Sequence, residues 1–127
     1  MIVVKLPFPD ASLFPNRRNG QHWGKTNGAK VSAHETAFFS TKQVSGGYVP
    51  PDGFIPLSVL FVTPTRHRRD WDGMAGAFKA YQDGMAAALG IDDSRFKPVL
   101  VDWVEGKKPG ACIVAVGVQI ISSQVIA

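Results

Sequence analysis

The sequence predicts a two-layer α/β (α+β) fold, in which a mixed sheet of about four strands carries two helices in the order β-α-β-α-β-β. Residues 57–63 (LSVLFVT) are almost continuously apolar, as is typical of a central strand. Residues 71–89 carry apolar side chains at helical spacing. The chain has 127 residues, of which 45% are hydrophobic, enough for one core. We therefore expect one domain over residues 1–127.

The first half of the chain predicts a strand, a helix and the central strand, separated by loops. Ile2–Leu6 is short, rich in β-branched residues and followed by a proline, as expected of a strand. Residues 7–28 are rich in proline, asparagine and glycine and predict a long loop, a kind of segment that is often functional. Lys30–Val44 predicts a helix, and residues 45–54 predict a second loop before the strand at Leu57–Thr63.

The second half begins with the clearest element, a helix over Trp71–Leu89. Its apolar side chains recur every three or four residues and form one stripe for burial, made of Met74, Ala77, Phe78, Tyr81, Met85 and Ala88. Gly90 suits the C-terminal cap of this helix. Val99–Val104 and Ala111–Ile121 predict the last two strands, and the sequence EGKKPG between them predicts a hairpin turn. We expect Trp71 to pack against the sheet.

The composition permits a polyanionic partner and disfavours several other classes of function. The formal net charge is +4. Cys112 is the only cysteine, so the chain has no internal disulfide, and we expect it in the core and the protein in a reducing cytosol. No apolar run has the length of a membrane span, and the first residues do not resemble a signal peptide. The three histidines are too scattered for a zinc site.

Charged residues gather around the start of the second predicted helix. A basic run, Arg66-His67-Arg68-Arg69, directly precedes two carboxylates. Five of the ten acidic residues lie between residues 66 and 95, namely Asp70, Asp72, Asp83, Asp92 and Asp93. Basic residues that border a small acidic cluster suit an enzyme that holds a phosphate backbone and brings a metal ion to it.

The acidic residues form a metal site only if the chain folds back along the helix. A helix of 19 residues is roughly 28 Å long, so Asp93 starts far from Asp70 and Asp72. If the three carboxylates meet, they repel each other unless a cation lies among them, and Mg²⁺ is the natural occupant. The alternative stays open at this point: Asp70 is also a good helix N-cap, and Asp92 and Asp93 follow a glycine where turn residues are common.

The arrangement of these motifs resembles the RusA family of Holliday junction resolvases. The resemblance rests on Arg-Arg-Asp-x-Asp at residues 68–72 and on Gly-hydrophobic-Asp-Asp at residues 90–93. The first strand with the following Pro7-Phe8-Pro9 and Asn16, the strand before the basic run and the closing hairpin also fit. The resemblance spans roughly residues 3–121 and is specific only as a composite.

The resemblance implies a homodimer that binds four-way DNA junctions and nicks two opposing strands with Mg²⁺, for which Mn²⁺ would substitute. Asp70, Asp72 and Asp93 match the catalytic, metal-binding carboxylates, and Asp92 is then their neighbour. The chain departs from the family at Gly73, where the family commonly has Asn, and at Gly76, where it tends to have Lys. Lys79 lies three residues beyond on nearly the same helix face, so it is a candidate replacement for that charge.

The candidate DNA-binding residues come from the basic run, the second helix and the long loop. They are Arg66, Arg68, Arg69, Lys79, Asn16, Arg17 and Arg18. His22 in the same loop is a further candidate contact, and Phe14 and Trp23 are candidate wedges at a branch point, although we favour ordinary loop anchoring for Phe14.

Three functional hypotheses remain open at this point. The first is a junction-resolving endodeoxyribonuclease of DNA recombination and repair, in the cytoplasm of a bacterial or phage-infected cell. The second is a non-catalytic branched-DNA-binding protein with a degenerate metal site. The third is a basic α/β domain that binds protein or small anions and uses Asp70 only as a helix cap.

Overall fold

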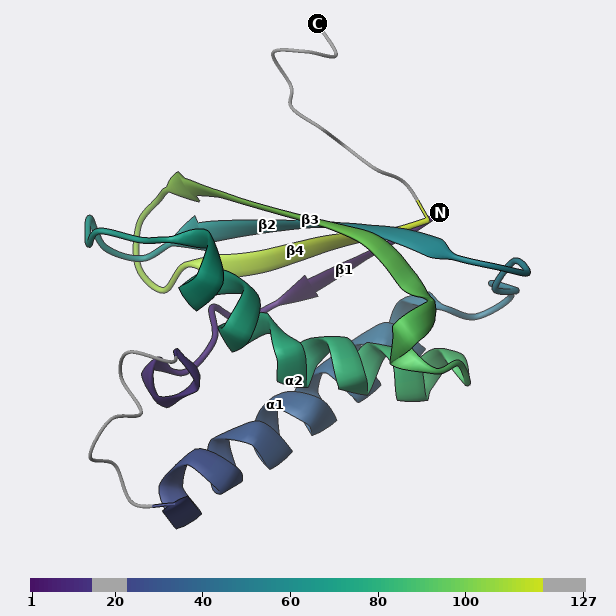
Figure 1. The fold of residues 1–127 in the computed structure, drawn as a ribbon, viewed down its shortest axis with the longest axis horizontal. Helices are drawn as coiled ribbons and strands as arrows, with labels where there is room; N and C mark the ends of the chain where they lie inside the picture. Colours follow the sequence, from purple (N-terminus) through teal and green to yellow (C-terminus); the bar gives the residue numbers. More distant parts are fainter. Residues whose placement is uncertain (15–22, 118–127) are drawn as a thin grey trace, which may run out of the picture.

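The computed structural model describes residues 1–14 and 23–117, in which one mixed sheet packs against two helices (Figure 1). In chain order the elements are β1 (Ile2–Leu6), the 3-10 helix η1 (Ala11–Leu13), α1 (Trp23–Val44), β2 (Ile55–Thr63), α2 (Trp71–Leu89), the 3-10 helix η3 (Asp93–Arg95), β3 (Phe96–Glu105) and β4 (Ala111–Val116). The expected two-layer class and the order β-α-β-α-β-β are confirmed.

The four strands form a sheet in the order β1-β4-β2-β3. β2 pairs in parallel with β3 and antiparallel with β4, and β4 pairs antiparallel with β1. β2 therefore has a hydrogen-bonded neighbour on each side, as its almost continuous apolar sequence predicted. The parallel pair β2–β3 is joined by α2, since parallel neighbours need a crossover connection.

The predicted hairpin between the last two strands is wrong, because β2 lies between β3 and β4. The connecting loop instead crosses the end of β2, where the backbone N–H of Gly106 donates to the carbonyl of Thr63 at 2.9 Å. A Cβ at Gly110 would lie 2.7 Å from the backbone oxygen of Val62. Glycine at this position therefore allows the loop to pass close over the end of the central strand.

α2 has the predicted bounds, and Gly90 caps it in the left-handed conformation with φ of 70°. α1, by contrast, begins at Trp23, so the expected loop over residues 7–28 is wrong in its last six residues and the helix is seven residues longer than predicted. The early part of α1 (WGKTNGAK) has no apolar periodicity, which is why its sequence did not predict a helix. Strands β2 and β3 also extend beyond the predicted ranges, and residues 118–121 of the last predicted strand lie outside the described residues.

Both helices lie on one face of the sheet (Figure 1). Between the layers, alternate strand residues such as Val4, Val59 and Val114 meet the buried stripe of α2. Among the described side chains of α1, the buried ones are small: Ala33, Ala37 and Thr41. Cys112 is fully buried, as expected for a core cysteine, and its burial raises the pKa of the thiol to about 12. None of the helices in the described ranges is long and apolar enough to cross a membrane.

Candidate functional site

The N-terminus of α2 lies beside the connection from β2, which brings the basic run and the first two candidate carboxylates together. Asp70 is the N-cap, and one of its carboxylate oxygens accepts from the backbone N–H of Gly73 at 2.7 Å. A Cβ at Gly73 would lie 2.9 Å from that oxygen, so glycine leaves room for the cap. A hollow of about 320 Å³ opens here and is lined by Phe8, Pro9, Ala11, Phe14, Pro64, Thr65, His67, Arg68, Arg69, Asp70, Gly73 and Met74.

Arg69 is held by the opening segment of the chain. Its guanidinium carbon lies 5.2 Å from the ring centre of Phe8 and 5.8 Å from that of Phe14, and these two rings stack on each other. Its guanidinium also donates to the hydroxyl of Thr65 at 3.2 Å. Cation–π contacts of this kind stabilise the loop. Arg69 and Phe14 therefore anchor the connection, and the reading of Phe14 as a loop anchor agrees with its position.

The other basic residues of the run face solvent. Arg66 forms an ion pair with Glu105 at 3.4 Å, and both side chains are mostly exposed, so the pair contributes little to stability. His67 and Arg68 are exposed and border the hollow beside Asp70. Arg68 is therefore the side chain of the run best placed for a phosphate near the start of α2.

Asp72 lies in the first turn of α2 and is exposed. Residues 72, 76, 79 and 83 follow one another at spacings of four, three and four, so they share one face of the helix. This charged stripe carries Asp72, Gly76, Lys79 and Asp83. Trp71, next to it, is 66% exposed, which corrects the expectation that it packs against the sheet.

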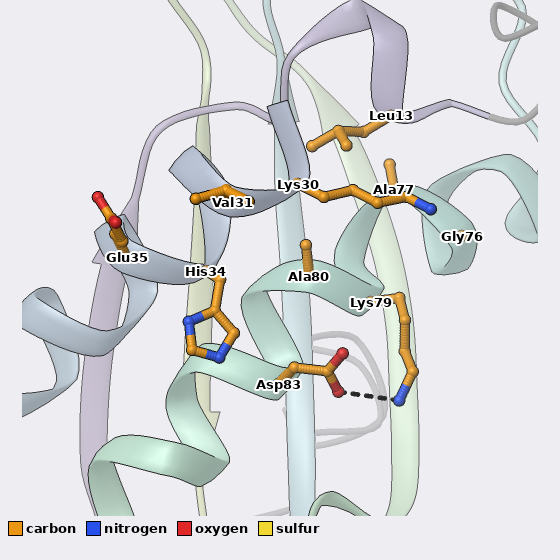
Figure 2. Close-up of a pocket in the computed structure, with 10 residues that line it drawn as sticks. All are labelled: Leu13, Lys30, Val31, His34, Glu35, Gly76, Ala77, Lys79, Ala80 and Asp83. Atoms are coloured by element: carbon orange, nitrogen blue, oxygen red, sulfur yellow. Dashed lines mark hydrogen bonds and ion pairs between the residues drawn. The ribbon is translucent and has the colours of Figure 1, made fainter. Parts of the chain in front are cut away.

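Lys79 joins two carboxylates. Its ammonium lies 2.9 Å from Asp83, one turn further on, and also forms an ion pair with Asp93 after the helix (Figure 2 shows the pair with Asp83). The hydrogen bond to Asp93 is the main cause that raises the pKa of Lys79. The same hydrogen bond is the main cause that holds the pKa of Asp93 below its usual value.

The three carboxylates expected to converge do not form one group. Asp93 has folded back along α2, as a shared site would require, but only as far as Lys79. Lys79 is seven residues from Asp72, which is about 10 Å along the helix axis. No three acidic, histidine or cysteine side chains within residues 1–14 and 27–117 gather closely enough to hold a metal ion. Lys79 is the cation that pairs with Asp93. From Asp93 on, η3 leads into β3, so the chain runs no further back along α2.

Asp92 has a local structural role. Its carboxylate accepts from the hydroxyl and from the backbone N–H of Ser94, and it caps η3. The hydroxyl hydrogen bond is the main cause that lowers the pKa of Asp92. Asp92 therefore caps η3 directly beside the candidate carboxylate Asp93.

A groove between the two helices escaped the sequence analysis. It has a volume of about 580 Å³ and is lined by Leu13, Lys30, Val31, His34, Glu35, Gly76, Ala77, Lys79, Ala80 and Asp83 (Figure 2). Small residues of α2 form its floor, and charged residues of both signs form its rim. The spacing of Lys79 and Asp83 could have predicted their ion pair. The contribution of α1 could not be predicted, because that helix shows no clear apolar stripe.

Asn16, Arg17, Arg18 and His22 lie outside the described residues, as does the side chain of Trp23. Their assignment as DNA contacts stays a prediction from the sequence.

The chain is similar to a protein of Xylella fastidiosa (strain Temecula1), which is described as an uncharacterized protein. The two are 39% identical over 108 residues, which cover 82% of this chain and 69% of the relative. No family model matches the chain.

Proposed function

This chain belongs to the same family as the uncharacterized Xylella fastidiosa protein, and we propose that it is a magnesium-dependent endodeoxyribonuclease that resolves four-way DNA junctions by paired phosphodiester hydrolysis. The observation that carries the proposal is the start of α2, where the exposed carboxylate of Asp72 and the cap carboxylate of Asp70 adjoin the exposed Arg68. The resemblance to the RusA family supports the same reading. A protein that acts on four-way DNA junctions would work in the cytoplasm of a bacterial or phage-infected cell.

The residues at the start of α2 fit a magnesium ion in part. Mg²⁺ is commonly held by one or two carboxylates together with water and substrate phosphate. Asp70 uses one oxygen as a cap and has a second, and Asp72 is exposed two residues on. Asp70 and Asp72 therefore fit the carboxylate part of this ligand set. Asp93 would become a third ligand only after its ion pair with Lys79 breaks. When bound, the ion would supply an activated water and stabilise charge on the scissile phosphate.

The remaining steps belong to the side chains and backbone of this protein. Arg68 and the first N–H groups of α2 bind a DNA phosphate, since a helix N-terminus favours anions. Arg69 positions this connection through its contacts with Phe8 and Phe14. Lys79 holds Asp93 and is the group that must release it for a third carboxylate to reach the site. In a homodimer, two related sites would make the paired cuts.

A variant experiment tests the site. Asp72→Asn should abolish cleavage of a synthetic four-way junction and preserve or tighten junction binding, because it removes charge and keeps the shape of the side chain. Asp52→Asn, which changes an exposed acid in the loop before β2, is the matched control and should cut normally. An Asp72→Asn protein that cuts at the normal rate would exclude this site.

A second candidate function is a branched-DNA-binding protein without catalytic activity. The observation that favours it is the ion pair of Lys79 with Asp93, which keeps the third carboxylate away from the other two. It predicts tight junction binding by both the parent protein and Asp72→Asn, with no cutting by either. Junction binding by the parent protein in the presence of Mg²⁺, without any nicked product, would favour this function over the nuclease.

A further inference from the structure

A second groove runs between α2 and β3 and begins at the first residue of α2. It has a volume of about 430 Å³ and is lined by Trp71, Ala75, Phe78, Gln82, Val99 and Val101. Its four α2 residues follow one another at spacings of four, three and four, so they share one face of the helix. β3 is the edge strand of the sheet, and its side chains Val99 and Val101 are only half-buried. The groove therefore lies at the sheet edge, where α2 leaves part of β3 uncovered.

The lining of this groove is uncharged, in contrast to the surface beside it. The amide of Gln82 and the indole N–H of Trp71 are its polar side-chain groups, and the other lining side chains are apolar. The charged Arg68, Asp70 and Asp72 lie at the start of α2, where the groove begins. The groove therefore suits a flat, neutral ligand with hydrogen-bonding edges, and it does not suit a phosphate or a metal ion. Its volume is within the usual range of small-ligand sites, about 300–1,000 Å³.

Trp71 lies at the end of the groove that is nearest to the candidate carboxylates. It is the residue between Asp70 and Asp72, and neighbouring Cα atoms are about 3.8 Å apart. Its side chain is 66% exposed, whereas tryptophan is usually one of the more buried residues in a protein. The exposed indole therefore offers a flat aromatic surface directly beside the two carboxylates.

Proteins bind unpaired nucleobases by stacking them on aromatic side chains. We propose that this groove, which we call the base groove, binds unpaired bases of the DNA strand whose phosphate lies at the start of α2. The first base stacks on Trp71, and the amide of Gln82 forms hydrogen bonds with the edge of a base further along the groove. Trp71 and Gln82 are eleven residues apart, about 16 Å along the helix axis, so the base groove has room for more than one base.

The inference rests on the proposed function, since it takes its ligand from the DNA strand that Arg68 and Asp72 hold. It adds a reason for selectivity between branched and linear DNA. A base must leave its stack to enter the base groove, and this costs least where the base is already unpaired or poorly stacked. A branch point offers such bases, and an intact duplex keeps them inside the helix. Trp71 accepts any base by stacking, whereas Gln82, with a donor and an acceptor, distinguishes one base edge from another.

Abasic sites in the DNA test the base groove in the full-length protein. Fluorescence anisotropy measures binding of labelled four-way junctions in EDTA, each junction lacking one base at a successive position around the branch point. The parent protein should bind at least about fivefold more weakly when the base that stacks on Trp71 is missing. The same abasic site should have no effect on Trp71→Ala, because the stacking partner of that base is already gone.

Phe39→Ala is the matched control for this variant. It removes an aromatic side chain of α1 that is 63% exposed, similar to the exposed fraction of Trp71, and it lies outside the base groove. Its profile of binding against abasic position should be that of the parent protein. Circular dichroism should show that both variants are folded, since an exposed side chain is replaced in each.

Gln82→Leu tests the second contact, because leucine has a similar size and lacks the amide. Junctions that carry each of the four bases at the sensitive positions should bind the parent protein with different affinities. They should bind Gln82→Leu with nearly equal affinities. Discrimination by Gln82→Leu that equals that of the parent protein would overturn the assignment of Gln82.

The base groove and the nuclease activity fail in different ways. A parent protein that binds no junction, or binds all abasic junctions alike, would overturn the base groove. So would an abasic effect that is as large in Trp71→Ala as in the parent protein. Cleavage of the unmodified junction with Mg²⁺ is measured separately. Cleavage together with a flat abasic profile would contradict the base groove alone, and a profile that depends on Trp71 without cleavage would contradict the nuclease alone.

Discussion

Asp70 has a structural and a proposed chemical role, and the two can be separated at this residue. Its carboxylate accepts from the N–H of Gly73 and caps α2. Asparagine caps helices as well as aspartate does, whereas alanine in place of either costs about 1 kcal/mol. Asparagine, however, lacks the negative charge that a magnesium ion requires.

We therefore expect Asp70→Asn to leave the free energy of unfolding nearly unchanged and to abolish junction cleavage. Urea denaturation and a cleavage assay measure the two effects. Asp70→Ala is the comparison and should lose both the cap and the activity. Normal cleavage by Asp70→Asn would mean that Asp70 is only a helix cap.

The ion pairs of Lys79 predict a pH dependence. The pKa of Asp93 is lowered chiefly by its hydrogen bond to Lys79, so the stabilisation it gives is present above the unfolded-state pKa of about 3.9 and is lost as the pH falls through the lower folded-state value. The pKa of Lys79 is raised, so its stabilisation is present at neutral pH and is lost only as the pH rises through the raised value. The cluster is therefore intact across the neutral range.

Lys79→Met should raise the pKa of Asp93, because the variant removes the ammonium that donates to Asp93. The same change leaves the carboxylate of Asp83 without the cation that it shares with Asp93. Carboxyl-carbon NMR titration in the presence of EDTA measures this shift. Lys42→Met, which removes an exposed lysine from α1, is the control. An Asp93 pKa that is the same in Lys79→Met and in the parent protein would show that the ion pair does not form in solution.

At the scale of elements, the contact between the two helices depends on Gly84. A Cβ at this position would overlap the backbone oxygen of His34 and touch the side chain of Ala37. The small buried residues of α1 complete this close approach. Glycine is otherwise unfavourable within a helix, by about 1 kcal/mol relative to alanine.

Gly84→Ala should therefore destabilise the protein by about 1–3 kcal/mol, the usual cost of overpacking, in spite of the better helix propensity. Gly28→Ala is the matched control in α1, where a Cβ meets nothing within 4 Å, and it should be neutral or stabilising by up to about 1 kcal/mol. Thermal denaturation compares them. Equal effects of the two substitutions would contradict the close contact.

Local patterns decide which elements the sequence could predict. α2 was predicted with its observed bounds because its apolar stripe, the N-cap Asp70 and the terminal Gly90 are all encoded within the segment. The start of α1 carries no such stripe. Further along this helix, the contact with α2 involves small residues. The hairpin prediction failed because the neighbour of a strand is decided by the whole sheet: β2 takes the place between β3 and β4.

The candidate site shows the same division. The charged run before α2 and its carboxylates are adjacent in sequence, so they could be placed together. The position of Asp93 depends on how far the chain returns along α2, and it reaches Lys79. The sequence contains no local signal for this distance.

At the scale of the whole molecule, a net charge of +4 and the exposed basic run predict DNA binding that weakens steeply with salt. Arg68→Ala should lower binding and reduce the slope of log binding constant against log salt by about 1, because one phosphate contact is lost. Lys42→Ala on α1 should leave the slope unchanged. Fluorescence anisotropy with a labelled four-way junction measures both. Binding that does not change with salt would contradict a phosphate interface and favour a site for protein or small anions.

Cleavage of a labelled synthetic four-way junction by the purified protein tests the central claim most directly. The assay compares Mg²⁺ with EDTA and includes a linear duplex of the same sequence. Paired nicks in opposing strands of the junction, dependent on Mg²⁺ and absent from the duplex, are the predicted result. An intact junction at saturating protein and Mg²⁺ would contradict the nuclease function.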